Sequence, residues 1–156
     1  MYTQKFVNLA WVFTFLLFFA ALMLSYSFLP EQFALLGLPS VDREVFFYVA
    51  LALFVVVNLA ALILRRLLEA LPVSSAVYRR NERFKERLIA WFGGLLSAVN
   101  VCLVTLVGYA ALSHNQGDFS INDFSFLVYV GPVLLGLCLV WLVMVLAGRR
   151  KYAVEG

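Results

Sequence analysis

The stretch that decides the fold is RRLLEALPVSSAVYRRNERFKER, Arg65–Arg87, the only long polar segment of the sequence. It carries seven basic residues against three acidic ones, and it separates two apolar halves. Basic loops beside apolar spans remain in the cytoplasm, so this segment predicts how every neighbouring helix crosses the bilayer. Its second half forms a cytoplasmic basic loop, which comprises Arg79, Arg80, Arg83, Lys85 and Arg87.

Four apolar blocks flank this segment, at residues 6–28, 45–64, 88–112 and 124–147, and 64% of all residues are hydrophobic. A soluble domain is about 45–50% apolar, and a membrane-spanning helix needs about 20 apolar residues, a length that each block reaches. Lipid leaves no partner for an open sheet edge, so each block should be helical. We therefore predict an all-α integral membrane four-helix bundle of two transmembrane hairpins. It is one membrane domain over residues 1–156, with helices at about 6–28, 45–68, 76–112 and 124–147.

The distribution of basic residues predicts the orientation. Of the 12 lysines and arginines, 11 lie at the N-terminus, in the central segment or in the tail, and only Arg43 lies on the other side. Both termini are then cytoplasmic, and the loops at 29–44 and 113–123 face outward. Because the basic residues border apolar blocks, we expect them to meet anionic headgroups and not nucleic acid.

The two longest loops carry further signals. Pro72 should end the inner extension of the second helix, and Ser74 or Ser75 can cap a new helix that continues into the third. Pro30 and Pro39 break the loop after the first helix, where apolar residues predict a short interfacial helix or a re-entrant turn. Asp42 should then cap the second helix, with Glu44 complementing its dipole.

Polar and small residues inside the spans predict helix contacts. At a rise of 1.5 Å per residue, Asn58 lies about 10 Å from the level of Arg65, and Asn100 about 20 Å from the level of Arg87. Direct pairing of the two is therefore not expected, and each should bond to a neighbouring helix. A ligand or ion site at either asparagine is the alternative. Small residues allow helices to approach closely, and buried amides form hydrogen bonds between helices. The predicted helix-packing set therefore comprises Asn58, Gly93, Ser97, Asn100, Gly108 and Gly136.

No combination of residues in the sequence indicates catalysis. Deep in the spans there is no acid or base of the kind that proton pumps and ion-coupled transporters need. His114 is the only histidine, so a bis-histidine haem within this chain is excluded. Cys102 and Cys138 fall inside apolar blocks, where they behave as small hydrophobic residues. We predict no enzyme activity, no catalytic, cofactor-binding or metal-binding residues, and no cofactor.

Three short motifs around the first loop resemble a bacterial membrane domain of unknown function found in SdpI-type immunity proteins. They are Leu29-Pro30 at the end of the first helix, Gly37-Leu38-Pro39 as a turn, and Phe46-Phe47-Tyr48 in the second helix. The family's usual histidine is absent, since Phe33 and Ala34 occupy that region. The family also has an acidic residue after the proline of the turn, and this sequence has Ser40 at that position instead. This resemblance implies a bacterial inner-membrane protein, in immunity or signalling, and transfers no active site.

Small size and the lack of charged residues within the spans lead to the functional prediction. We expect a non-catalytic accessory or structural subunit of a larger bacterial inner-membrane complex, such as a respiratory one. Its partners would be the lipid bilayer and other integral membrane proteins, in a homo- or hetero-oligomer. An SdpI-type immunity or signalling protein is the alternative, and a small channel or carrier is a third that the missing polar pathway disfavours.

Overall fold

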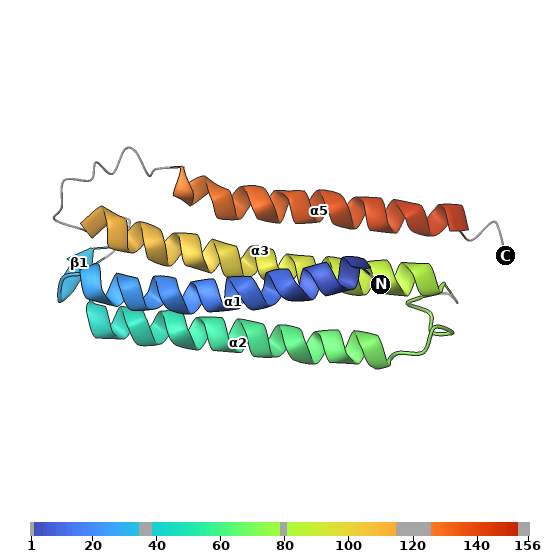
Figure 1. Cartoon of the computed structure of the whole chain (residues 1–156), viewed down its shortest axis with the longest axis horizontal. Helices are drawn as coiled ribbons and strands as arrows, with labels where there is room; N and C mark the ends of the chain where they lie inside the picture. Colours follow the sequence, from blue (N-terminus) through green and yellow to red (C-terminus); the bar gives the residue numbers. More distant parts are fainter. Residues whose placement is uncertain (1, 35–38, 79–80, 115–125, 153–156) are drawn as a thin grey trace.

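The computed structural model describes residues 2–34, 39–78, 81–114 and 126–152. Within these residues the chain forms four long helices and a pair of short strands. The elements are α1 (Tyr2–Phe28), β1 (Gln32–Ala34), β2 (Ser40–Asp42), α2 (Arg43–Ala70), α3 (Glu82–His114) and α5 (Leu127–Tyr152). Each helix is long and apolar enough to cross a membrane, and the four run side by side (Figure 1). The predicted all-α, multi-pass membrane bundle is therefore confirmed.

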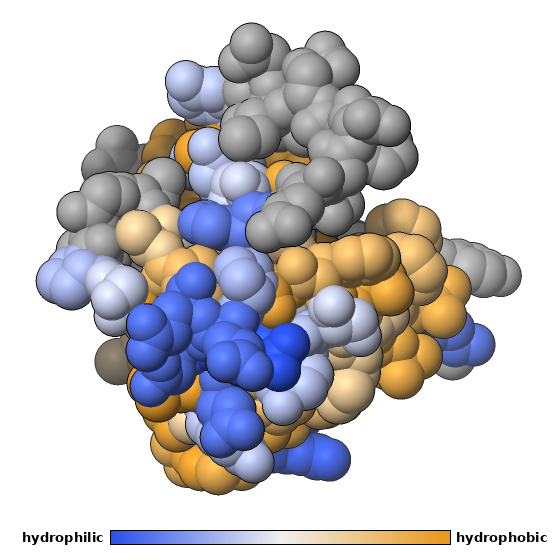
Figure 2. Space-filling view, turned by 90° about the vertical axis from the view of Figure 1, so that its left-hand side faces the viewer, coloured by the Kyte–Doolittle hydropathy of each residue, from blue (hydrophilic) through white to orange (hydrophobic). Residues whose placement is uncertain are grey.

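The two ends of the bundle differ. The start of α1, the end of α5 and the connection between α2 and α3 lie at one end, which we call the basic end (Figure 1). The opposite end, which carries β1 and β2, is the hairpin end. Figure 2 views the hairpin end, where hydrophilic residues gather in the middle of the face and apolar residues flank them. Polar ends and apolar sides are the pattern of a bundle that spans a bilayer.

Helix α3 is the central element. It packs extensively against both α1 and α5, whereas α2 makes fewer contacts with α1 and α3. In its most apolar stretch 39% of the α3 residues are buried, against 11% in α2 and 17% in α5. The main apolar core joins Phe18 and Leu22 of α1 to Phe54 of α2 and Val107 of α3. The Phe18 and Phe54 rings stack in parallel, with centroids 3.9 Å apart.

The connection from α2 to α3 differs from the expected continuous helix. Residues 73–78 form turns and α3 begins only at Glu82, so the predicted start near residue 76 is wrong. The cap is Asn81, whose Oδ1 accepts a hydrogen bond from the Phe84 amide at 2.9 Å, whereas Ser75 Oγ is buried without a partner among the described residues. Tyr78 supplies the reason, because its side chain is fully buried and draws the connection onto the bundle.

The loop after α1 is a β-hairpin and not the interfacial helix or re-entrant turn that we expected. Strands β1 and β2 pair antiparallel, with Phe33 opposite Val41. Phe33 is buried, and its ring contacts the rings of Phe46 and His114. In a strand, successive side chains point to opposite faces. The extended conformation of β1 therefore buries Phe33 while its neighbours Gln32 and Ala34 stay exposed.

The start of α2 follows from the same hairpin. Asp42 occupies the N-cap position of α2 but makes no side-chain cap bond. Its Oδ1 accepts a hydrogen bond from Gln32 Nε2 at 3.0 Å. The expected capping role of the Asp42 side chain is therefore wrong, while Glu44 does lie in the first turn. Arg43 ties the hairpin to the bundle: its guanidinium lies 4.6 Å from the Tyr26 ring centroid and donates to the Leu29 carbonyl.

Orientation in the membrane is open to a direct labelling test. We predict that Ser40→Cys, at the hairpin end, reacts with a membrane-impermeant maleimide in intact cells, and that Ser74→Cys, at the basic end, does not. Both serines are exposed, and both changes are conservative. The background should carry Cys102→Ala and Cys138→Ala. Labelling of Ser74→Cys alone would reverse the orientation that the basic residues predict.

Candidate functional site

The strongest polar feature of the membrane-embedded core is an amide pair between α2 and α3. Asn58 Nδ2 donates to Asn100 Oδ1 at 2.9 Å, and Asn100 Nδ2 donates to Asn58 Oδ1 at 3.2 Å. Both side chains are buried. Helix α1 joins the pair, because Trp11 Nε1 donates to Asn58 Oδ1 at 3.1 Å. Three helices are thus held together by one hydrogen-bonded group.

Our expectation that the two asparagines would not pair was wrong. That expectation placed Arg65 and Arg87 at one level of the membrane. In the structure Arg65 Nη1 lies 3.9 Å from the Cβ position of Gly93, so Arg65 is level with Gly93. Arg65 is seven residues from Asn58, and Gly93 is seven residues from Asn100, so the two asparagines lie at one level. Arg87 is six residues before Gly93 in α3 and therefore lies about 9 Å farther along the axis than Arg65. Figure 1 shows α3 running beyond the end of α2.

The hydrogen-bond capacity of Asn58 argues against a ligand site there. Its amide nitrogen donates to Asn100 Oδ1 and to the Phe54 carbonyl, and its oxygen accepts from Trp11 and Asn100. A primary amide offers two donors and two lone pairs, so every position is occupied. The arrangement therefore connects helices, which is the role the sequence predicts for Asn58 and Asn100.

The other predicted packing residues divide into two groups. A Cβ on Gly93 would lie 2.5 Å from Val7 Cγ1, so Gly93 permits close approach of α1 and α3. Ser97 Oγ donates to the Gly93 carbonyl within α3. By contrast, a Cβ on Gly108 or Gly136 would meet no described atom within 4 Å. Neither of these two glycines makes a close helix contact within the described chain.

Two glycines outside the predicted packing set lie at close contacts between α3 and α5, Gly94 on α3 and Gly131 on α5. A Cβ on Gly94 would lie 2.5 Å from Trp141 Cζ3, and a Cβ on Gly131 would lie 2.9 Å from the Cα of Cys102. Gly131 is buried. The only signal in the sequence is that Gly131 directly precedes Pro132 inside α5, a pair that is typical of a helix kink and not of a contact.

Several basic residues at the basic end are bound into the fold. Arg65 forms an ion pair with Glu69 at 2.9 Å, and only 13% of its side chain is exposed. Lys85 Nζ donates to the carbonyls of Glu69 and Leu71, each at 2.7 Å, and so caps the end of α2. Lys85 was predicted as part of a cytoplasmic basic loop; Arg79 and Arg80 of that loop lie outside the described residues.

Tyr78 completes this region. Its hydroxyl donates to the Leu68 carbonyl at 2.6 Å, and Lys85 Nζ lies 5.4 Å from its ring centroid. Burial raises the pKa of the Tyr78 phenol above its usual value, and the nearby Glu69 carboxylate raises it further. The phenol therefore stays neutral and keeps its donor.

Lys85→Met should weaken the attachment of α2. Methionine keeps an apolar side chain but removes the charged donor from two helix-end carbonyls, and we expect a loss of about 1–3 kcal/mol. Thermal unfolding of the purified protein in detergent would measure it. The control is Arg66→Met, because the Arg66 side chain is 85% exposed and its contact with Glu69 is 3.7 Å. Equal effects of the two changes would contradict the capping role.

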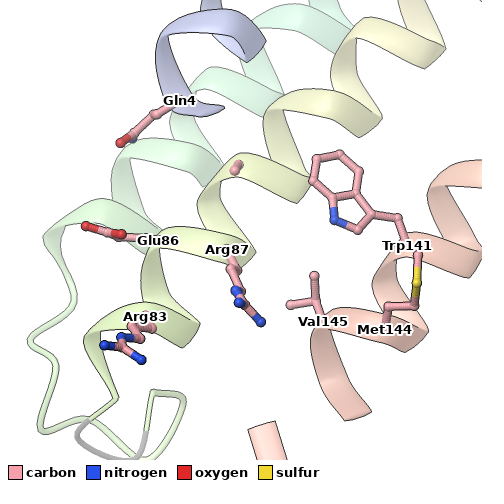
Figure 3. Close-up of a pocket in the computed structure, with 8 residues that line it drawn as sticks. Gln4, Arg83, Glu86, Arg87, Trp141, Met144 and Val145 are labelled. Carbon is pink, nitrogen blue, oxygen red and sulfur yellow. The ribbon is translucent and has the colours of Figure 1, made fainter. Parts of the chain in front are cut away.

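A cleft at the basic end is the second polar feature. It has a volume of about 580 Å³ and lies where the start of α1, the start of α3 and the second half of α5 meet (Figure 3). The lining residues are Gln4, Arg83, Glu86, Arg87, Ala90, Trp141, Met144 and Val145. One part of this wall is charged and the other apolar, so the cleft is amphipathic.

Within the described residues, no group of three or more His, Cys, Asp or Glu side chains could hold a metal ion. His114 Nδ1 lies 3.0 Å from the Ala110 carbonyl and 2.9 Å from Ser113 Oγ, and its ring contacts Phe33. Its surroundings fit the packing of the hairpin onto α3.

No family model, curated protein or solved structure matches this chain. The fold and the described contacts define it as a multi-pass membrane protein in which three membrane-spanning helices pack around the fourth, α3.

Proposed function

We propose that this protein is a non-catalytic accessory or structural subunit of a larger complex in a bacterial inner membrane. The supporting observation is the unequal packing of the helices, since α2 and α5 bury few of their residues while α3 buries the largest share. Large outer surfaces of α2 and α5 are therefore available to other transmembrane helices.

The chemistry of the core is consistent with this role. Trp11 donates to Asn58, and Asn58 pairs with Asn100, so this hydrogen-bonded group connects three helices. Association of helices in lipid depends on close packing and polar contacts, because lipid is as apolar as leucine. A rigid bundle with small residues on its outer surface suits lateral association.

Gly136 provides the sharpest test of this proposal. It lies on the exposed surface of α5, with no described atom within 4 Å of a Cβ. If that surface contacts another protein, Gly136→Phe should remove co-purifying partners from gently solubilised native membranes without changing the stability of the purified chain. Leu59→Phe, on the exposed surface of α2, tests the other face. A wild-type protein that purifies as a lone monomer without partners would refute the subunit role.

An SdpI-type immunity or signalling function is the second proposal. The observation in its favour is that two of the three motifs meet at the hairpin end: Leu29-Pro30 directly follows α1, and Phe46 of α2 contacts Phe33 of β1, the residue at the place of the family's histidine. Gly37 and Leu38 of the remaining motif lie outside the described residues. An immunity protein should protect cells from a toxin, so deletion should produce a growth defect that removal of the toxin reverses. A deletion strain that grows normally beside toxin-producing cells would exclude this function.

A further inference from the structure

The cleft at the basic end has two chemically distinct parts. Trp141, Met144 and Val145 of α5 and Ala90 of α3 form its apolar wall, while Arg83 and Arg87 project from the first two turns of α3. Trp141 also packs against the apolar cluster of Tyr78, Phe84 and Val145, so this wall is continuous with a buried cluster at the basic end. The cleft thus runs from the charged end of the bundle onto its apolar side.

The charges of the cleft favour an anion. Arg83 and Arg87 are one helical turn apart, which places their side chains on the same face of α3. The Arg87 guanidinium reaches α5, where its Nη1 lies 3.4 Å from the Cβ position of Gly148. Glu86 is the acidic residue of the lining, and Figure 3 shows its side chain pointing away from Trp141. Of the charged side chains labelled in Figure 3, Arg87 lies nearest the apolar wall, whereas Arg83 lies on the side of Glu86.

Trp141 adds a hydrogen-bond donor. The carbons Cζ3, Cη2 and Cε3 of its six-membered ring lie against Gly94, so the opposite edge with Nε1 faces away from that contact. Figure 3 shows the indole nitrogen on the side of the ring toward Arg87 and Val145. Among the described residues this N–H has no hydrogen-bond partner. Trp91 differs, because its Nε1 donates to the Cys138 carbonyl at 2.8 Å.

We propose that this cleft binds an anionic phospholipid. The phosphate lies against Arg83 and Arg87, the indole N–H of Trp141 donates to a phosphate or ester oxygen, and an acyl chain follows Met144 and Val145 along α5. Basic pockets between transmembrane helices recognise anionic headgroups in this way, and indole rings favour the headgroup level. A free phosphate would use the arginines but not the apolar wall. The assignment is independent of the subunit role.

The test is native mass spectrometry of the full chain in detergent, titrated with dioleoyl phosphatidylglycerol or with dioleoyl phosphatidylcholine. These lipids share their acyl chains and differ in headgroup charge. We expect the wild-type protein to prefer the anionic lipid, and Arg83→Gln and Arg87→Gln each to weaken its binding about fivefold, the effect of about 1 kcal/mol per cation near an anionic surface. Trp141→Phe keeps an aromatic side chain in the apolar wall, removes the N–H and should weaken binding of both lipids.

Arg66→Gln is the matched control, because it removes one positive charge at the same end of the bundle from a side chain outside the cleft. It should leave the binding of phosphatidylglycerol unchanged. Thermal unfolding of each variant establishes that it is folded, and Trp141→Phe tests the cleft even if an arginine variant is not. Equal binding of the two lipids, an equal loss in Arg66→Gln, or competition by inorganic phosphate at matched concentration would overturn the proposal.

Discussion

Gly131→Leu is expected to separate α5 from α3 and to destabilise the bundle by about 3 kcal/mol. A Cβ at this position would lie 2.7 Å from Cys102 Sγ and 2.9 Å from Cys102 Cα. The second of these atoms belongs to the backbone, which cannot rotate away as a side chain can. Inserting bulk into a close-packed contact displaces backbones and distorts rotamers, at a cost of about 1–3 kcal/mol or more. Thermal unfolding in detergent, with yield from the membrane, would measure the loss.

Gly136→Leu is the matched control for this substitution, because it makes the same change five residues along the same helix. Its added side chain meets no described atom within 4 Å, so stability should be unchanged or slightly improved. Combining Gly131→Leu with Cys102→Ala should restore little, since the Cα of residue 102 remains in place. A full rescue by that double variant would show that the Cys102 sulfur, and not the backbone, limits the contact.

Asn100→Leu is expected to lower stability by about 1–2 kcal/mol while leaving membrane insertion intact. Leucine has nearly the shape of asparagine and inserts readily, but it leaves Asn58 Nδ2 and Oδ1 each without one partner. An unsatisfied amide in an apolar interior carries this cost. The measurement is thermal unfolding in detergent, beside the fraction of protein recovered from membranes.

A double-mutant cycle measures the coupling free energy between Asn58 and Asn100 separately from their contacts with other residues. Asn58→Leu combined with Asn100→Leu should cost less than the sum of the single changes, with a coupling of about 0.6–1.7 kcal/mol. Asn8→Leu, at an exposed position of α1, controls for the substitution itself and should change stability by less than about 0.5 kcal/mol. Additive effects at residues 58 and 100 would mean that the two amides do not act as a pair.

Length and apolar composition were enough to predict the four helices from sequence. A bilayer imposes one requirement on every segment, namely that its backbone be satisfied internally over about 20 residues. Residues 6–28 and 45–68 were therefore found almost as α1 and α2. The same pattern failed at residues 76–78 and, in the loop after α1, at residues 32–34 and 40–42, where the burial of Tyr78 and Phe33 decides the backbone conformation. Those two residues look like ordinary aromatics in the sequence.

The contacts between helices were decided only by the tertiary structure. Sequence predicted that Asn58 and Asn100 hold helices together, because a lone amide in lipid needs a partner. It could not show that they pair with each other, since that depends on how far α3 extends beyond α2. Nor could it distinguish Gly131, which touches the Cys102 backbone, from Gly136, which is open. Apolar composition determines that a segment crosses the membrane, whereas the rotation and axial shift of each helix depend on close packing with its neighbours, which composition does not encode.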